Sequence, residues 1–533
     1  MFPSYRLLAS VRLPLALLVF LSTTGCSVAN SPLAANSNYD RDEQMFVAGY
    51  EDIDEVYIQK PDMGNLTMGG LSALASIDDK ISVTRSPDKV ELLYDGKTDA
   101  DYVVNGRFAA DDWAVLTTGV VEETRKISPA VAKADSEAIY QAVFNGVDAR
   151  LDPFTRYAGQ VQAEEHRALR EGFGGIGVRI SVVDGLVRVV SIVHYTPAER
   201  AGMHVDDVIT AIDGTPTKSM DEQTVVEKLR GPVDSRVVLT IARTGVQAPL
   251  TVAITRALVI PETVSYRREG DIAYFRIYSF NLDTADSLRR AFEDARNEIG
   301  PHMRGIVLDL RGNPGGLLDQ AVAMCDLFLD HGRVVSTKGR HPDSDQYYEA
   351  TPGDISEGLP IAVLVNGGSA SASEIVAAAL QDNGRAVVIG SNSYGKGTVQ
   401  TVFPMPNKGE LTVTWARFHA PSGYTLNHLG VLPNICTDDE TLDATQIMAD
   451  LGAGRIPPLP IAQRDSVSPD DTPALDKLRA LCPVYKAERA IDLQVALRLL
   501  TQPNLYGRAV ALAAPKDYQS GDQSALNQTS AQP

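Results

Sequence analysis

Short apolar runs alternate with amphipathic stretches between residues 265 and 390, and this alternation limits the possible folds more than any other feature of the chain. The runs AYFRIY, GIVLDL, IAVLV and AVVIG have the length and the β-branched content of buried strands. SLRRAFEDARNEI, LLDQAVAMCDLFL and SEIVAAALQ have the length and apolar spacing of helices. Strands that alternate with helices in this way predict a parallel α/β layer.

The regions on either side of this layer have other patterns, so we expect a multidomain α+β protein. Residues 46–165 have a mostly helical apolar spacing, with a strand-like insert at about 80–130 that contains KVELLY, DYVV and WAVLTTGVV. Residues 166–257 alternate short strand-like runs with turns. We place the α/β core at 258–440 and a C-terminal helical unit at 441–514, and we expect the polar tail at 515–533 to be disordered.

The first residues, MFPSYRLLASVRLPLALLVFLSTTGC, have a basic start, an apolar run and small residues before Cys26. This pattern is typical of an export signal and is too short for a permanent membrane anchor. The small residues before Cys26 resemble a bacterial lipobox, although Thr23 stands at the usual leucine position. We therefore expect a lipoprotein-type signal at 1–25, lipidation of Cys26 and a tether at 26–45. The protein would lie on the periplasmic side of a bacterial envelope and reach the membrane only through the lipid anchor. Cleavage within ANSPLAANS, without lipidation, is the alternative.

Composition excludes some classes of function. A net charge of −19 and a pI of about 4.9 argue against nucleic-acid binding, which depends on patches of lysine and arginine. The 8 histidines form no H-E-x-x-H or comparable ligand cluster, so we expect no catalytic metal and no other cofactor. If a disulfide forms, Cys436 and Cys482 are the expected pair, because Cys325 lies in an apolar helical pattern and is expected in the core.

The stretch EGFGGIGVRI carries Gly172, Gly174 and Gly177 at the spacing of a dinucleotide-binding turn. Such a turn leaves a strand and opens a helix, so that helix amides face the pyrophosphate. In this chain the order is reversed, since the helix-prone AEEHRALRE precedes the glycines and VRISVV follows them. The order argues against a dinucleotide site and leaves the purpose of the glycines open.

Three further stretches carry candidate chemistry, and the first is VLDLRGNPGGLLDQ. A buried-type strand runs into Gly315 and Gly316 and then into a helix. Glycines at such a turn expose backbone N–H groups that can bind a negatively charged oxygen. A tight turn that needs a positive φ at glycine explains the same residues without any site.

The second stretch is NGGSASASEIVAAALQDNG, which begins a helix after the strand IAVLVN. Ser371 and Glu374 have the S-x-x-E spacing of a capping box, which is a structural role. Serines at a helix start also fit an exposed nucleophile whose following N–H stabilises an oxyanion. The residues alone do not distinguish Ser369, Ser371 and Ser373.

The third stretch, AVVIGSNSYGKGTVQTV, comes one residue short of a nucleotide-binding P-loop. Gly397 occupies the position where a serine or threonine would hold Mg²⁺, and TVQTVF is strand-like rather than helical. Lys396 could instead be the base that deprotonates a serine, if burial keeps its amine neutral. A solvated loop lysine is the other interpretation.

Together these stretches resemble the C-terminal processing peptidases, or tail-specific proteases, which are PDZ-containing serine–lysine peptidases. LDPFTRY, FGGIGV, LDLRGNPGG, SASASEI, LQD and GKGTVQ occur in the family's order between about residues 136 and 435. The resemblance implies a PDZ domain at 166–257 before a crotonase/ClpP-like (ββα) α/β serine protease core at 258–440, with helical regions at both ends. It also implies site residues: the nucleophile Ser371, the general base Lys396, Gln400 as a residue that positions the lysine, and the N–H groups of Gly316 and Ala372 as the oxyanion hole.

The resemblance also gives the glycine-rich loop a purpose. FGGIGV is similar to the carboxylate-binding loop of a PDZ domain, so a peptide carboxylate would bind its amides and the peptide would add as a strand along RISVV. A helix with Thr224, Val225 and Leu229 would form the other wall and favour an apolar last side chain. The expected carboxylate-binding residues are Phe173, Gly174, Gly175, Ile176, Gly177 and Val178.

The implied function is that of an exported serine endopeptidase that recognises the C-terminal tails of proteins and cleaves near that end. Its expected partners are protein or peptide substrates with apolar C-terminal tails, with an adaptor protein and a homo-oligomer as further possible partners. The alternative is a PDZ adaptor with a dormant protease-like core. Pro314 and Asn434 replace residues more usual in the family, and no role follows for the insert or for the C-terminal unit.

Overall fold

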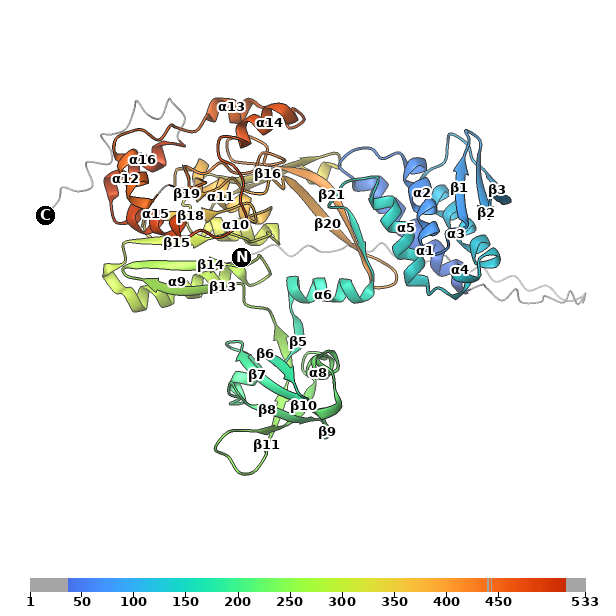
Figure 1. Ribbon diagram of the computed structural model, residues 1–533, viewed down its shortest axis with the longest axis horizontal. Coiled ribbons are helices and arrows are strands. Elements are labelled where there is room, and N and C mark those ends of the chain that lie inside the picture. Colours follow the sequence, from blue (N-terminus) through green and yellow to red (C-terminus); the bar gives the residue numbers. More distant parts are fainter. Residues whose placement is uncertain (1–36, 439–440, 442, 514–533) are drawn as a thin grey trace, which may run out of the picture.

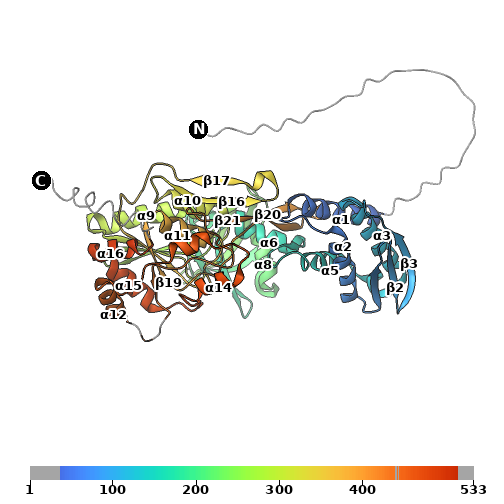
Figure 2. The ribbon, with the colours of Figure 1, turned by 90° about the horizontal axis from the view of Figure 1, so that it is seen from above.

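The computed structural model describes residues 37–438, 441 and 443–513. It is an elongated molecule with the N-terminal region at one end and the C-terminal helices at the other, and both views show this arrangement (Figures 1 and 2). The predicted export signal, Cys26 and the tail at 515–533 lie outside the described residues. The prediction of a tether to residue 45 is wrong for its last part, because helix α1 already begins at Ser37. Within the described residues, no helix combines the length and the apolar character that a bilayer crossing needs.

The N-terminal region is a helical bundle with a small sheet on one side. Its helices are α1 (Ser37–Val56), α2 (Met63–Ser72), the 3₁₀ turn η1 (Ala73–Ser76), α3 (Ala110–Ile127), α4 (Pro129–Lys133) and α5 (Ser136–Asp148), and its antiparallel sheet has β1 (Ile81–Arg85), β2 (Lys89–Tyr94) and β3 (Lys97–Val103).

The prediction of a strand for WAVLTTGVV is wrong, because this run forms the middle half of α3. Asp112 accepts a hydrogen bond from the backbone N of Ala109 (2.9 Å) and so begins the helix. Trp113, Val120 and Val121 are buried at helical spacing against the other helices. Packing of this face therefore outweighs the strand preference of the β-branched residues.

A long hairpin joins the N-terminal region to the rest of the molecule (Figure 1). It consists of β20 (Thr398–Pro404) and β21 (Glu410–His419), and Met405, Leu411 and Val413 belong to the hydrophobic core of the N-terminal helices. The short strand β4 (Arg156–Ala158) pairs with β21, and helix α6 (Gln160–Glu171) follows it. Lys396 immediately precedes this hairpin, so the N-terminal region is connected directly to a predicted site residue.

The expected PDZ domain is a separate β unit that two chain segments connect to the core (Figure 1). The segments are β5 (Phe173–Gly175) and β12 (Ala257–Val259), which pair with each other. The sheet has the order β11-β10-β8-β7-β6, so β6 is an edge strand. The elements of the unit are β6 (Val178–Val183), β7 (Leu186–Ile192), α7 (Pro197–Arg200), β8 (Val208–Ile212), β9 (Thr215–Pro216), η2 (Thr217–Ser219), α8 (Glu222–Leu229), β10 (Arg236–Ala242) and β11 (Leu250–Thr255).

The predicted parallel α/β layer is confirmed in the core. Strands β14 (Ile272–Ile277), β15 (Gly305–Asp309), β18 (Ile361–Val365), β19 (Ala386–Gly390) and β22 (Ile435–Cys436) run parallel in this order, with β13 (Val264–Glu269) antiparallel at one edge. A second sheet has the order β17-β16-β21-β20, with β16 at Arg333–Gly339 and β17 at Gln346–Glu349. Two 3₁₀ turns complete the core, η3 (Gly300–His302) and η4 (Pro342–Ser344).

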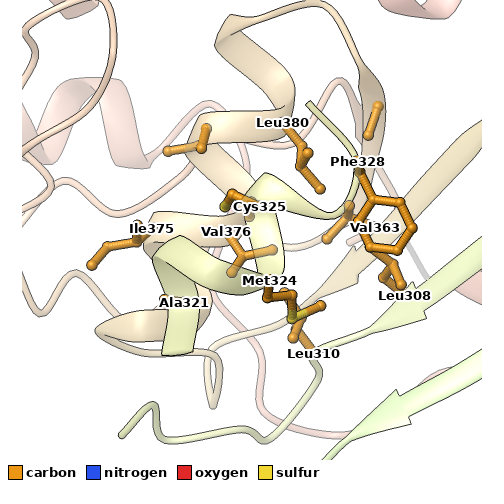
Figure 3. Close-up of a cluster of buried hydrophobic side chains, with 14 of the residues drawn as sticks. Leu308, Leu310, Ala321, Met324, Cys325, Phe328, Val363, Ile375, Val376 and Leu380 are labelled. Atoms are coloured by element: carbon orange, nitrogen blue, oxygen red, sulfur yellow. The ribbon is translucent and has the colours of Figure 1, made fainter. Parts of the chain in front are cut away.

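Helices cover both faces of the parallel sheet. On one face lie α9 (Thr284–Ile299), α10 (Leu318–Asp326) and α11 (Ala372–Asp382), and Figure 3 shows side chains of α10 and α11 against Leu308 and Val363. Cys325 is fully buried in this cluster, as predicted. On the other face, α15 of the C-terminal unit brings Val495 and Leu499 against Val307, whereas α14 packs Leu475 and Leu478 into the cluster of the first face. The helices of this unit are α12 (Ala444–Gly452), α13 (Ile461–Ser466), α14 (Thr472–Arg479), α15 (Ala490–Leu500) and α16 (Pro503–Ala511).

Candidate active site

Ser371 stands at the turn between β18 and helix α11, in a conformation that L-residues rarely adopt. Its φ is 56° and its ψ is −116°, and it is 8% exposed. Residues held in such strained conformations cluster at functional sites, because the surrounding structure must enforce them. The turn presents the Ser371 hydroxyl at the carboxyl end of the parallel sheet, where α/β proteins bind their ligands.

Hydrogen bonds distinguish the three candidate serines. Ser369 Oγ donates to Leu310 O (2.8 Å) and accepts from Asn366 N (3.0 Å), and Ser373 Oγ donates to Asn313 O (3.0 Å). Both hydroxyls therefore hold loops together. Ser371 Oγ makes no capping bond to α11. Of the three hydroxyls, that of Ser371 is the one left for chemistry.

Glu374 makes one of the two hydrogen bonds of the predicted capping box, and it also binds the loop of Lys396. Its fully buried carboxylate accepts hydrogen bonds from Ser371 N (2.7 Å), Ser393 Oγ (2.5 Å), Gly395 N (2.7 Å) and Lys396 N (2.9 Å). Burial raises the pKa of Glu374 above its ordinary value, and these donated hydrogen bonds oppose that shift. One carboxylate thus ties the turn of Ser371 to the loop of Lys396. The S-x-x-E spacing showed the capping bond, but no sequence pattern indicated the bonds to the lysine loop.

The glycine turn packs directly on the serine turn. Gly315 has φ 99°, and a Cβ atom there would lie 2.8 Å from Ser371 Cβ and 3.0 Å from Ala372 N. Gly316 has φ 148°, and a Cβ there would lie 2.0 Å from Phe280 O. Glycine is therefore required at both positions, because neither the conformation nor the space admits a side chain.

The two predicted oxyanion donors lie at this junction. Asn313 Oδ1 accepts from Gly315 N (2.8 Å), and Asn313 O accepts from Ala370 N (3.0 Å), so one side chain and its backbone fix both turns. The N–H groups of Gly316 and Ala372 donate to no acceptor within the described chain. Two free amides beside a strained serine are the arrangement that binds a developing oxyanion.

Lys396 lies in an environment that favours its neutral amine. Its Nζ is 4.8 Å from the centre of the Phe154 ring. Burial and, to a smaller extent, the positive charge of Arg156 lower the pKa of Lys396 to about 8, while Glu374 and Asp152 oppose the shift. No hydrogen bond joins Lys396 Nζ to Ser371 Oγ in the described chain, and catalytic hydrogen bonds are often formed only when substrate is bound.

Gln400 lies on β20, and its side chain binds residues other than Lys396. Its Nε2 donates to Thr398 Oγ1 (2.9 Å) and Thr414 Oγ1 (3.1 Å), and Thr414 Oγ1 donates to Asp152 Oδ1 (3.0 Å). The structure thus connects Gln400 to the turn that carries Phe154 but gives it no hydrogen bond to Lys396. Its role in positioning the lysine stays a prediction.

The structure excludes the nucleotide-binding alternative for the lysine loop. β20 is a strand where a P-loop has a helix, and a Cβ atom at Gly397 would lie 1.9 Å from Asn427 N. A serine or threonine that could hold Mg²⁺ has no space at this position.

The predicted carboxylate loop lies at the end of an open groove in the β unit. The groove, of about 820 Å³, is lined by β6, by Val226 and Leu229 of α8, and by core residues that include Tyr278. Because β6 is an edge strand, its backbone groups can pair with an added peptide strand. The predicted helix lines the groove through Val226 and Leu229, whereas Val225 is fully buried in the core of the unit.

The loop itself divides into a strand and a turn. Phe173, Gly174 and Gly175 form β5, and Val178 begins β6. Between them, Ile176 O accepts from Ala198 N (2.8 Å) and Gly177 O accepts from Val193 N (2.9 Å). The N–H groups of Ile176 and Gly177 have no acceptor within the described residues, so these two amides are the ones available to a carboxylate.

Comparison with known proteins identifies the family of this chain. The sequence model of peptidase family S41 matches residues 271–437, and that of the PDZ domain matches residues 188–243. A carboxy-terminal-processing protease of Bartonella bacilliformis is 41% identical over 306 residues, which are 57% of this chain and 70% of that relative. The chain belongs to peptidase family S41.

The chain is also similar to a second curated protein and to a solved structure. A probable CtpA-like serine protease of Staphylococcus aureus is 34% identical over 318 residues, covering 57% of this chain and 61% of that protein. Among solved structures, the photosystem II D1 C-terminal processing protease is 26% identical, covers 75% of this chain and 94% of its own, and superposes with a TM-score of 0.37. The S41 peptidase described here is thus a serine-type C-terminal processing protease with a PDZ domain that precedes its catalytic core. The predicted family, fold class and enzyme class are confirmed.

Proposed function

We propose that Ser371 is the nucleophile and Lys396 the general base of this S41 peptidase. One observation carries the assignment: the buried Glu374 carboxylate accepts hydrogen bonds from Ser371 N and Lys396 N through the same oxygen, Oε2 (2.7 and 2.9 Å). The backbones of the two residues are therefore held next to each other by one atom. Ser371 has the free hydroxyl, and Lys396 has the lowered pKa that a base needs at neutral pH.

The reaction follows from these roles. Neutral Lys396 removes the proton from Ser371 Oγ, which attacks the scissile carbonyl carbon. The oxygen of the tetrahedral intermediate accepts hydrogen bonds from the N–H groups of Gly316 and Ala372. Protonated Lys396 then gives its proton to the leaving amine, and water, deprotonated by the same lysine, hydrolyses the acyl-enzyme.

We further propose that substrates with apolar C-terminal tails bind along β6. The tail carboxylate would meet the amides of Ile176 and Gly177, and its last side chain would pack between Val226 and Leu229. Export, lipidation of Cys26 and a periplasmic location complete the proposal and rest on the sequence of the first residues. An adaptor protein and a homo-oligomer are proposed partners on the resemblance to the family alone.

The test compares the wild type with Ser371→Ala and Lys396→Ala on a loosely folded reporter that ends in apolar residues, with products identified by mass spectrometry. We expect cleavage near the reporter's C-terminus by the wild type alone, and slower cleavage when the reporter's terminal carboxylate is amidated. Cleavage by Ser371→Ala would refute the nucleophile assignment. Binding of the tail without cleavage by any of the three proteins would favour the PDZ adaptor with a dormant core.

A further inference from the structure

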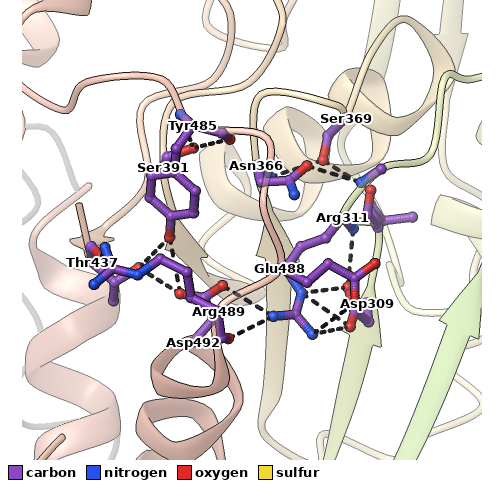
Figure 4. A network of polar contacts seen from close by, with 12 residues as sticks. Asp309, Arg311, Asn366, Ser369, Ser391, Thr437, Tyr485, Glu488, Arg489 and Asp492 are labelled. Atoms are coloured by element: carbon purple, nitrogen blue, oxygen red, sulfur yellow. Dashed lines mark hydrogen bonds and ion pairs between the residues drawn. The ribbon is translucent and has the colours of Figure 1, made fainter. Parts of the chain in front are cut away.

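A segment of the C-terminal unit crosses the end of the parallel sheet where the active-site loops begin. This segment, residues 482–492, is called the strap here. β15, β18 and β19 lead into the oxyanion turn, the serine turn and the lysine loop, and because the strands are parallel all three loops leave the same edge. A disulfide between Cys436 and Cys482 fixes the start of the strap, and α15 begins at its end. Figure 4 shows the strap residues Tyr485, Glu488, Arg489 and Asp492 against these loops.

The strap binds the serine turn through its backbone. Tyr485 O accepts from Gly367 N (2.6 Å), and Lys486 O accepts from Asn366 Nδ2 (2.7 Å). A Cβ atom at Gly367 would lie 2.4 Å from Val484 Cγ1, so the two segments are in direct contact. The strap therefore holds in place the residues that lead to Ser371.

The same strap carbonyl reaches the lysine loop. Tyr485 O also accepts from Ser391 Oγ (3.2 Å), and Tyr485 N donates to Ser391 Oγ (3.3 Å). Ser391 directly follows β19 and begins the loop that carries Lys396. One peptide unit of the strap thus joins the serine turn to the lysine loop.

The end of the strap holds the oxyanion turn. Arg311 Nη1 donates to Arg489 O (2.8 Å) and to Asp492 Oδ2 (3.1 Å), and Arg311 also pairs with Asp309 at the end of β15. Asp492 is fully buried, and its second oxygen accepts from Tyr485 Oη (3.0 Å) and Thr437 Oγ1 (2.7 Å). Asp492 therefore connects the chain before Gly316 with Tyr485.

We propose that the strap is a positioning device for catalysis, with Asp492 and Tyr485 as positioning residues that set the spacing of the serine turn, the lysine loop and the oxyanion turn. The inference rests on the proposed roles of Ser371, Lys396 and Gly316. Neither positioning residue touches the reacting atoms: Asp492 acts through Arg311, and Tyr485 acts through Gly367 and Ser391. Displacement of catalytic groups by about 1 Å can reduce the rate of a reaction about 100-fold, so small shifts of these loops have large consequences.

The chain offers matched controls for both residues. Tyr506 of α16 also binds the parallel sheet through its hydroxyl, at Ile361 N (3.0 Å) and Arg385 O (3.2 Å), but at the amino ends of β18 and β19. Asp476 of α14 is exposed and binds His428 (2.8 Å). Tyr506→Phe and Asp476→Asn thus make the same chemical changes in the same unit, away from the strap.

The experiment uses the full chain as wild type, Asp492→Asn, Tyr485→Phe and the two controls. A fluorophosphonate titrates the active serine, so that kcat is expressed per labelled site and a partly unfolded variant is not mistaken for a slow one. We then measure kcat, KM, and the affinities for a peptidyl boronate and for an uncleaved tail peptide. The boronate reports the geometry of the serine and the oxyanion hole, and the tail peptide reports the PDZ domain.

We expect Asp492→Asn and Tyr485→Phe to lower kcat per labelled site about 10- to 100-fold and to lower the affinity for the boronate by a similar factor. The affinity for the tail peptide should be unchanged. The controls should leave kcat per site unchanged. An unchanged kcat and boronate affinity in the strap variants, or an equal loss in Tyr506→Phe, would overturn the proposal. If Asp492→Asn does not fold, Tyr485→Phe decides, because it removes the hydroxyl contacts with Asp492 and Thr437 while the backbone contacts keep the strap in place. A wild type that is not labelled at Ser371 would instead contradict the proposed nucleophile.

Discussion

The chemistry of this site depends most on the protonation state of one residue, Lys396. Its amine can accept the Ser371 proton only when neutral, and burial lowers its pKa to about 8 from the ordinary 10.5. At pH 7 the neutral fraction is then about one tenth, whereas an unshifted lysine would have less than about 0.1% neutral amine. The lowered pKa therefore makes a lysine usable as a base near neutral pH.

We expect kcat/KM to rise with pH and level off above an apparent pKa of about 8, because the active form is the deprotonated one. Below that value activity should fall about tenfold per pH unit. The measurement is a pH profile of peptide cleavage between pH 5 and 10, with binding of a tail peptide as a control for the PDZ domain. Activity that stays flat down to pH 5 would rule out a lysine base.

At the scale of single elements, α8 of the PDZ domain decides how tails are recognised. Two consecutive valines of this helix lie in different environments, since Val225 is buried in the domain and Val226 lines the groove. Val226→Glu should lower the affinity for an apolar tail peptide about tenfold or more. The new carboxylate would lie where the last side chain of the peptide packs, and it would repel the peptide's own carboxylate. Fluorescence polarisation with a labelled tail peptide measures the effect.

The matched control is Glu227→Ala, on the same helix but outside the groove lining. It should leave the affinity within about twofold. Equal tail affinity of Val226→Glu and the wild type would place the tail elsewhere.

The disulfide between Cys436 and Cys482 anchors the C-terminal unit to β22 across a sequence separation of 46 residues. Closing a loop of this length restricts the unfolded chain, so Cys436→Ser with Cys482→Ser should lower the free energy of unfolding by about 2 to 4 kcal/mol. Urea denaturation followed by circular dichroism checks this change. A reductant should shift the wild type to the same midpoint and leave the double variant unchanged; coincident midpoints without reductant would show that the crosslink contributes nothing.

Elements with a clear period could be predicted from the sequence, and elements whose residues have conflicting preferences could not. The parallel strands were visible because burial on both faces produces continuous apolar runs such as IAVLV. The α3 run WAVLTTGVV was mistaken for a strand because its β-branched residues hide a helical period that only the packing against α1 reveals. Likewise, the sequence placed three serines at one helix start, and only their hydrogen bonds separate Ser371 from Ser369 and Ser373.

At the scale of the whole molecule, segments far apart in sequence meet at the active site. The turn that carries Phe154 lies near the end of the N-terminal region, Ser371 and Lys396 belong to the core, and the strap belongs to the C-terminal unit. Such long-range contacts leave no periodic signal, which is why the sequence assigned no role to the C-terminal unit. The positions of these segments depend on the β20–β21 hairpin and on the packing of α15, which join the regions into one body.

The contact between the N-terminal region and the core places a charged residue near Lys396. Arg156, on β4, is exposed, and its positive charge lowers the pKa of Lys396. Arg156→Gln removes that charge, so the pKa of Lys396 should rise and less of the amine should be neutral at pH 7. We expect kcat/KM at pH 7 to fall about 2- to 10-fold, with the acid limb of the profile displaced upward by a few tenths of a unit to about one unit and activity at pH 10 restored. Arg150→Gln makes the same change of charge at a residue bound to Asn65 and should leave the profile in place. Because the effect is electrostatic through solvent, high salt should reduce it. A loss of equal size at every pH would show instead that Arg156 holds the turn in place, and that the base is tuned by burial alone.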